Sequence, residues 1–101
     1  MFENTWLDRT EKLIGKENLK KLQNVFIVVC GLGGVGSYVV EGLVRSGIKN
    51  IAIIDNDIID ITNINRQLIA NTTNIGISKV KVESERIKEI NPNANIIEVN
   101  E

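Results

Sequence analysis

The feature that most constrains the fold of this chain is a glycine-rich turn between an apolar run and a helical segment. Residues 24–31 read NVFIVVCG, a continuous β-branched run that is typical of a strand buried on both faces of a parallel sheet. The overlapping segment GLGGVG has the G-x-G-x-x-G spacing, and VGSYVVEGLVRSG after it has helical periodicity. A strand, a glycine turn and a helix in this order predict a nucleotide-binding α/β unit.

Each glycine of this turn has its own expected role. Gly31 allows the tight turn, and Gly33 and Gly34 let a phosphate approach the backbone without a Cβ in the way. Gly36 lets the helix lie close against the strand. The helix N-terminus then presents free N–H groups to an anion. At this point a purely structural turn without a ligand remains the alternative.

The rest of the chain alternates helices with strands. The pattern predicts two short helices on either side of Gly15, a second buried strand at NIAIID, an amphipathic helix capped by Ser78, and a third strand at ANIIEV. In the helix after the turn, the expected buried stripe is Val35, Val39, Leu43 and Val44. The predicted fold class is α/β: the N-terminal half of a Rossmann-like parallel sheet, about three strands, preceded by short helices.

Composition narrows the chemistry further. The 101 residues suffice for one small domain, and a net charge of -1 gives no general footprint for nucleic acid, although it does not exclude RNA as a substrate. The chain has no His, which removes the commonest general base and metal ligand, and no metal site is expected within it. The single cysteine, Cys30, is expected to pack in the core as a small hydrophobe.

No membrane segment is predicted from the sequence. Residues 1–12 are charged and lack the apolar run of a secretory signal. The longest apolar run, VFIVVCGLGGVG, is broken by glycines and is too short to span a bilayer. The expectation is a soluble, cytoplasmic protein that does not bind membranes.

Acidic residues follow the second predicted strand. Asp55 closes that strand roughly twenty residues after the glycine turn, where this fold places an acid whose carboxylate accepts both ribose hydroxyl protons. The turn and Asp55 together indicate a nucleotide and by themselves suit NAD. Asp57 is a further candidate ligand, with a turn-forming or solvated role as its alternative. For Asp60 the turn-forming role is the better interpretation.

The segment TNINRQ, residues 62–67, favours nucleotide activation over redox chemistry. Transfer of AMP to a carboxylate requires an enzyme to hold a triphosphate and to stabilise the leaving pyrophosphate. Arg66 offers a planar fork for phosphate oxygens, and Asn63 adds a neutral donor or a metal-facing carbonyl. The spacing of Asn63, Arg66 and Gln67 predicts one short helix that presents all three on one side. Lys79 is either a phosphate ligand or a solvated surface charge.

Four motifs in this order, GLGGVGSYVVEGLVRSGI, IIDNDIIDITNINRQ, IGISKV and INPNA, resemble the HesA/MoeB/ThiF superfamily of adenylating enzymes, relatives of the ubiquitin-activating enzymes. The resemblance covers the chain from about residue 9 onward. It implies an ATP- and Mg²⁺-dependent homodimer. It also implies ATP contacts at Gly34, Asp55, Asn63, Arg66 and Lys79, with Asp55 at the ribose. Catalytic roles would fall to Arg66 and Lys79 at the phosphates, and to Arg9 reaching into the partner's site.

Within the superfamily, TNINRQ, RSGI and RTEKLIG are closer to the tRNA threonylcarbamoyladenosine dehydratase branch. That branch implies ATP-dependent activation of the carboxylate of threonylcarbamoyladenosine in tRNA, followed by cyclisation. Three alternatives stay open: activation of the C-terminus of a ubiquitin-like sulfur-carrier protein, an NAD-binding oxidoreductase fragment, and a fragment that only binds a partner.

Members of the superfamily are much longer than this chain. Residues 1–101 are therefore expected to form the N-terminal part of a nucleotide-binding adenylating domain. The resemblance places a magnesium-binding Asp and the substrate-facing region beyond Glu101. The third strand would then be an open edge or would pair with another chain.

Overall fold

The computed structural model describes residues 5–101, in which helices alternate with parallel strands as predicted. The expectation about a secretory signal rests partly on residues 1–4, which lie outside the described residues. The elements are α1 (Asp8–Ile14), α2 (Lys16–Asn24), β1 (Phe26–Cys30), α3 (Gly36–Arg45), β2 (Asn50–Ile54), a 3-10 turn η1 (Ile61–Asn63), α4 (Lys79–Ile90) and β3 (Asn95–Val99).

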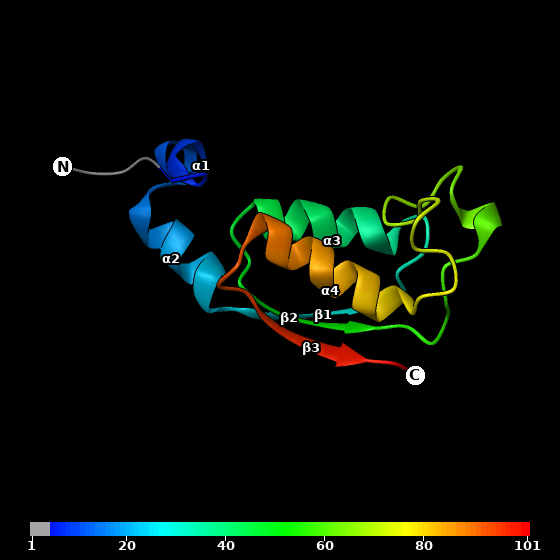
Figure 1. Cartoon of the computed structure of the whole chain (residues 1–101). Coiled ribbons are helices and arrows are strands. Elements are labelled where there is room, and N and C mark those ends of the chain that lie inside the picture. Colours follow the sequence, from blue (N-terminus) through cyan, green and yellow to red (C-terminus); the bar gives the residue numbers. More distant parts are fainter. Residues whose placement is uncertain (1–4) are drawn as a thin grey trace.

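The three strands form one parallel sheet in the order β1-β2-β3. Parallel neighbours need crossover connections, and these are α3 between β1 and β2 and α4 between β2 and β3. Both helices lie on the same face of the sheet (Figure 1). The carboxyl ends of all three strands consequently meet at one edge, at the right of Figure 1. The predicted Rossmann-like α/β class is confirmed.

The core lies between this face of the sheet and the two crossover helices. It includes Ile51 and Ile53 of β2, Val40 and Val44 of α3, and Ile87 of α4, all at most 2% exposed. These apolar side chains leave water together, which is the main favourable contribution to folding. The core thereby fixes the first turn of α3 and the first turn of α4 beside the carboxyl edge of the sheet.

The buried stripe of α3 differs from the prediction. Val35 is 78% exposed and Val39 is 44% exposed, whereas Ser37 and Val40 are fully buried. Val35 precedes the helix, and the Ser37 hydroxyl donates to the Gly33 carbonyl at 2.6 Å. The buried stripe runs through Ser37, Val40 and Val44, and the bond to Gly33 provides the buried Ser37 hydroxyl with a partner.

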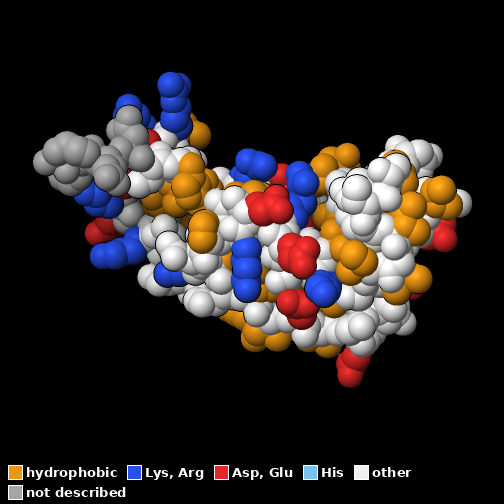
Figure 2. Space-filling model, viewed as in Figure 1, with side chains coloured by type: hydrophobic (Ala, Val, Ile, Leu, Met, Phe, Trp, Pro, Cys, Tyr) orange, Lys and Arg blue, Asp and Glu red, His pale blue; other side chains and the backbone are white. Residues whose placement is uncertain are grey.

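The prediction that β1 is buried on both faces is wrong for this chain. Phe26 and Val28 are 53% and 52% exposed, and Cys30, expected in the core, is exposed. The reason is that α3 and α4 cover one face only, so the opposite face remains open. We define this open sheet face by Phe26, Val28, Cys30 and Ile97. Figure 2 shows apolar side chains along the lower edge of the molecule, below the helices.

The N-terminal helices form a separate arm at the amino edge of the sheet (Figure 1). Gly15, with a φ of 89°, separates α1 from α2, as predicted. Leu19 anchors α2 because it is 6% exposed and packs beside Gly47. None of the helices in residues 5–101 is long and apolar enough to cross a membrane.

Candidate functional site

The candidate site lies where the glycine turn (residues 31–36), Asp55 and the start of α4 meet at the carboxyl edge of the sheet. Gly31 has a φ of 90°, a conformation that favours glycine, and its N–H donates to the Ile54 carbonyl at 2.7 Å. The Leu32 N–H donates to Asp55 Oδ2 at 2.7 Å. The turn after β1 is therefore tied directly to the acid after β2.

The four glycines of the turn fall into two groups. A Cβ at Gly36 would stand 1.7 Å from the Gly31 carbonyl oxygen, so close packing excludes any other residue there. A Cβ at Gly34 would have no neighbour within 4 Å, and one at Gly33 would make only an ordinary contact of 3.8 Å with Gln67 Nε2. Neither has a positive φ. The fold thus requires Gly31 and Gly36 but leaves open space at Gly33 and Gly34.

Unpaired backbone donors face this space. The N–H groups of residues 33–36 donate to no acceptor among the described residues, and Gly36 begins the ten-residue helix α3. The first N–H groups of a helix have no partner within it and carry a partial positive charge. Open space above such donors suits a phosphate group.

Asp55 is held by two backbone amides. Oδ2 accepts from Leu32, and Oδ1 accepts from the Asp57 N–H at 2.7 Å. An ionised carboxylate has about four lone-pair sites, so about two are left for further donors such as ribose hydroxyls. The ribose role of Asp55 is compatible with this geometry and stays a prediction.

Asp57 and Lys79 form an ion pair at the start of α4. Nζ of Lys79 lies 3.8 Å from Oδ2 of Asp57, and the Lys79 N–H donates to the Asp57 carbonyl at 3.0 Å. The Lys79 side chain is 6% exposed, whereas that of Asp57 is 69% exposed. The interpretation of Lys79 as a solvated surface charge is therefore wrong. Ser78 caps the helix through Oγ, as predicted.

Asn63 is committed to the local turn. Its Oδ1 accepts from the Asp60 N–H at 2.8 Å, while Asp60 Oδ2 accepts from the Thr62 N–H at 2.9 Å, which makes a reciprocal cap. The hydroxyl and amide of Thr62 also hold the pKa of Asp60 below its ordinary value. The turn-forming interpretation of Asp60 is confirmed. The side-chain carbonyl of Asn63 already accepts this bond from Asp60, so the side-chain NH₂ is the group left for a ligand.

The expected short helix presenting Asn63, Arg66 and Gln67 on one side is wrong. The 3-10 turn η1 ends at Asn63, and the chain continues as turns. Asn63 and Gln67 are each 8% exposed, while Arg66 faces solvent and donates to the Thr62 carbonyl at 2.9 Å. The reciprocal cap pulls Asn63 inward and leaves Arg66 on the outer side.

Gln67 lies beside the glycine turn. Its Nε2 lies nearest to the position that a Gly33 Cβ would take. Its Oε1 is buried and accepts no hydrogen bond from the described residues. Buried polar atoms nearly always have a partner, so this amide marks a polar spot beside the turn.

Arg9 does not reach this site within its own chain. It is exposed on α1, at the end of the molecule opposite the glycine turn (Figure 1). Its predicted role in a partner's site stays a prediction.

Sequence reasoning missed a buried acid on α4. Glu83 is fully buried, and neither carboxylate oxygen has a hydrogen-bond partner in residues 5–101. Burial raises its pKa to about 8, Glu41 of α3 adds to the rise, and Arg86 opposes it. The available signal was the four-residue spacing of Lys79, Glu83 and Ile87, which places all three on one stripe of the helix.

The chain is similar to curated tRNA threonylcarbamoyladenosine dehydratases. It is 47% identical over 89 residues to that of Bacillus subtilis, covering 88% of this chain and 35% of the relative. It is 49% identical over 85 residues to that of Haemophilus influenzae, covering 84% of this chain and 33% of the relative. The chain thus spans about a third of the length of these relatives.

A solved structure of such a dehydratase is also similar to this chain. The Escherichia coli tRNA N6-threonylcarbamoyladenosine dehydratase in complex with ATP matches with a TM-score of 0.91 and 38% sequence identity, over 100% of this chain and 43% of that one. The ThiF family matches residues 7–101. The resemblance inferred from the motifs is confirmed. The chain belongs to the ThiF family.

Proposed function

We propose that this chain is the nucleotide-binding part of an ATP-dependent enzyme that acts on threonylcarbamoyladenosine in tRNA. The enzyme transfers AMP from ATP to the carboxylate and releases pyrophosphate, and the activated carboxylate then cyclises and expels AMP. The observation that carries the proposal is the open space at Gly33 and Gly34, faced by free N–H groups and bordered by Asp55. The relatives named above support the choice of reaction. Residues 1–101 would be the N-terminal part of the adenylating domain.

In this proposal, different residues bind different parts of ATP. The N–H groups of residues 33–36 bind the phosphates at the start of α3. Asp55 accepts the ribose hydroxyls through its remaining lone pairs. Lys79, held beside Asp57, supplies positive charge toward the phosphates as pyrophosphate leaves.

Asn63, Gln67 and Arg66 complete the proposed phosphate site. Asn63 offers its NH₂ group, because its carbonyl accepts from Asp60. Gln67 offers Nε2 beside Gly33. Arg66 leaves its contact with the Thr62 carbonyl to bind phosphate oxygens bidentately, as a solvent-facing Arg can do without disturbing the core.

Mg²⁺ belongs to the proposal as the ion that neutralises the phosphates when ATP is bound. The described residues hold no group of three or more His, Cys, Asp or Glu side chains able to bind a metal. The protein ligands of this ion would lie beyond Glu101, where the family resemblance implies a magnesium-binding Asp.

A homodimer, with Arg9 reaching into the partner's site, and a cytoplasmic location complete the proposal. The exposed position of Arg9 on α1, remote from its own glycine turn, supports action in trans. A charge supplied in this way is worth about 10³–10⁵ in rate in phosphoryl-transfer enzymes. Activation of a ubiquitin-like sulfur carrier is the alternative within the family, and the oxidoreductase alternative has no support from the family assignment.

The test is a calorimetric titration of the whole chain with ATP and Mg²⁺, with NAD as the control ligand. Gly34→Ala places a methyl group in the open space and is expected to weaken ATP binding about tenfold or more without changing the melting temperature. Gly42→Ala is the matched control, because a Cβ there also meets nothing within 4 Å but lies on α3 away from the turn. Arg66→Ala is expected to weaken ATP binding similarly.

Two results would contradict the proposal. Tighter binding of NAD than of ATP would restore the oxidoreductase interpretation. An equal loss of ATP affinity in Gly34→Ala and Gly42→Ala would mean that the glycine turn does not hold the phosphates.

A further inference from the structure

Helix α2 of the N-terminal arm carries a basic surface to which the proposed nucleotide site assigns no role. Figure 2 shows Lys and Arg side chains gathered at this end of the molecule. Residues 16–24 contain three Lys and one Glu, a local charge of +2, whereas the whole chain has a net charge of -1. The arm therefore attracts anions although the protein as a whole does not.

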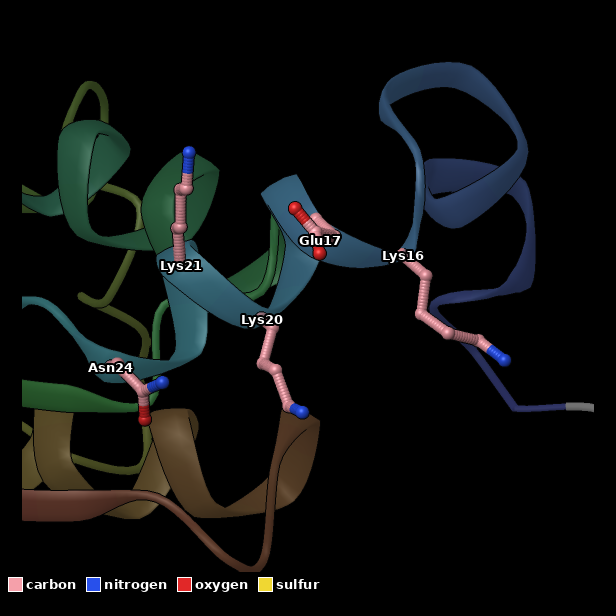
Figure 3. A pocket seen from close by; sticks show the side chains of 5 residues that line it. All are labelled: Lys16, Glu17, Lys20, Lys21 and Asn24. Atoms are coloured by element: carbon pink, nitrogen blue, oxygen red, sulfur yellow. The ribbon is translucent and has the colours of Figure 1, made fainter.

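Three lysines of α2 form the centre of this surface. Lys16 and Lys20 are four residues apart and share one side of the helix with Asn24, with about 6 Å of axial rise between successive positions. With Glu17 and Lys21 they line a cavity of about 350 Å³ (Figure 3). None of the three lysines forms a salt bridge with another described residue. Their charges are thus available to a ligand.

The polar character of α2 indicates which polyanion fits. Its exposed side chains are all charged or amide side chains: Lys16, Glu17, Asn18, Lys20, Lys21 and Asn24. A helix that binds a lipid surface needs an exposed apolar face, but Leu19 is buried against the body of the molecule. Lysines on a helix whose exposed side chains are all polar are suited to the phosphodiester backbone of a nucleic acid.

We propose that α2 binds the backbone of the substrate RNA through Lys16 and Lys20, which point to the same side of the helix (Figure 3). The naming of RNA as the substrate rests on the proposed function. The arm and the glycine turn lie at opposite ends of a molecule 45 Å long. Within one chain these lysines are remote from the glycine turn, so they position the RNA and take no part in the chemistry at that turn.

The test measures binding of a fluorescein-labelled, unmodified tRNA transcript to the whole chain by anisotropy, between about 50 and 200 mM KCl. Lys16→Gln/Lys20→Gln is expected to weaken binding about fivefold to tenfold and to reduce the slope of log K against log [salt] by roughly 1.5 to 2. Lys81→Gln/Lys88→Gln removes the same charge from exposed positions on α4 and is expected to change the affinity and the salt slope much less. Circular dichroism verifies that both variants fold.

The same proteins are titrated with ATP to separate this inference from the proposed function. If ATP binds but the α2 variant keeps wild-type tRNA affinity, the inference is overturned and the proposed function stands. If ATP does not bind but tRNA binding still depends on Lys16 and Lys20, the proposed function fails and the inference stands. Equal losses in the two double variants, or preferential binding to phosphatidylserine vesicles, would overturn the inference.

Discussion

Lys79 and Glu83 lie one turn apart on the same side of α4, and both are buried, yet the structure treats the two groups in opposite ways. Lys79 stands at the carboxyl edge of the sheet, with Asp57 3.8 Å from Nζ and a backbone bond to the same residue. Glu83 lies between α4 and α3, with no hydrogen-bond partner among the described residues. Lys79 has an opposite charge beside it, whereas the fold suppresses the charge of Glu83.

Burial and the presence of a partner together determine what an ionisable group can do. A buried charge is costly unless it is paired. Lys79 has a carboxylate beside it, so its ammonium group can serve an incoming phosphate. Glu83 has Glu41 nearby, which is itself held ionised because Arg86 and then Arg45 lower its pKa. A second negative charge there is disfavoured, so Glu83 binds a proton instead.

The largest expected effect is a pH dependence of stability that comes from Glu83. Its pKa rises from 4.5 to about 8 on folding, so the folded state binds more protons than the unfolded state between these values. Stability is therefore greatest below about pH 4.5 as far as this group is concerned, and it is lost as the pH rises toward 8. We expect about 3 kcal/mol to be lost between pH 5 and pH 8, measured by urea unfolding.

Glu83→Gln provides the control, because it keeps the shape and removes the titration. The chain has no His, so no other side chain has an ordinary pKa within this window. The lowered pKa values of Glu41 and Asp60 affect stability only at more acidic pH, where their protonation destabilises the fold. An unchanged slope in Glu83→Gln would mean that Glu83 is not the buried acid responsible.

The second effect is a loss of ATP affinity on replacement of Lys79. Lys79→Met keeps most of the buried volume but removes the ammonium group, and hydrogen bonds to charged groups contribute about 1.5–3 kcal/mol. Calorimetry should therefore give an affinity about ten- to a hundredfold weaker. Stability should change by less than about 1 kcal/mol, because the Asp57 left behind is mostly exposed.

The two variants should have opposite effects on stability and on ATP binding. Glu83→Gln should alter the pH dependence of stability and leave the ATP affinity within about twofold of wild type, whereas Lys79→Met should do the reverse. If Lys79→Met instead destabilised the fold strongly and left ATP binding unchanged, both buried groups would be structural, and the phosphate role of Lys79 would be wrong.

The sequence was sufficient for those features that depend on local pattern. The order of helices and strands, the break at Gly15, the cap at Ser78 and the requirement for glycine at Gly31 each follow from spacing or from a backbone conformation. They could be predicted because the responsible residues are neighbours in the chain.

Features that depend on distant neighbours could not be predicted in this way. The exposure of Val28 and Cys30 follows from both crossover helices lying on one face of the sheet. The burial of Glu83 depends on the rotation of α3 against α4. The outward position of Arg66 results from the cap between Asp60 and Asn63, which favours a local turn over a regular helix. Residue spacing alone does not show which of the two forms.

The smallest expected effect tests what Asp57 does for Lys79. Asp57→Asn keeps the bond from the Lys79 N–H to the Asp57 carbonyl, so the start of α4 should be unchanged and stability should vary by less than about 0.5 kcal/mol. Nζ loses the carboxylate that holds it at the open edge, and we expect calorimetry to give a two- to fivefold weaker ATP affinity. An increase in affinity would contradict this, because it would mean that Asp57 competes with phosphate for Nζ. In that case the ion pair that distinguishes Lys79 from Glu83 would oppose ligand binding. The Asp57 carboxylate, which makes burial of the Lys79 charge tolerable, would have to be displaced from Nζ by the ligand.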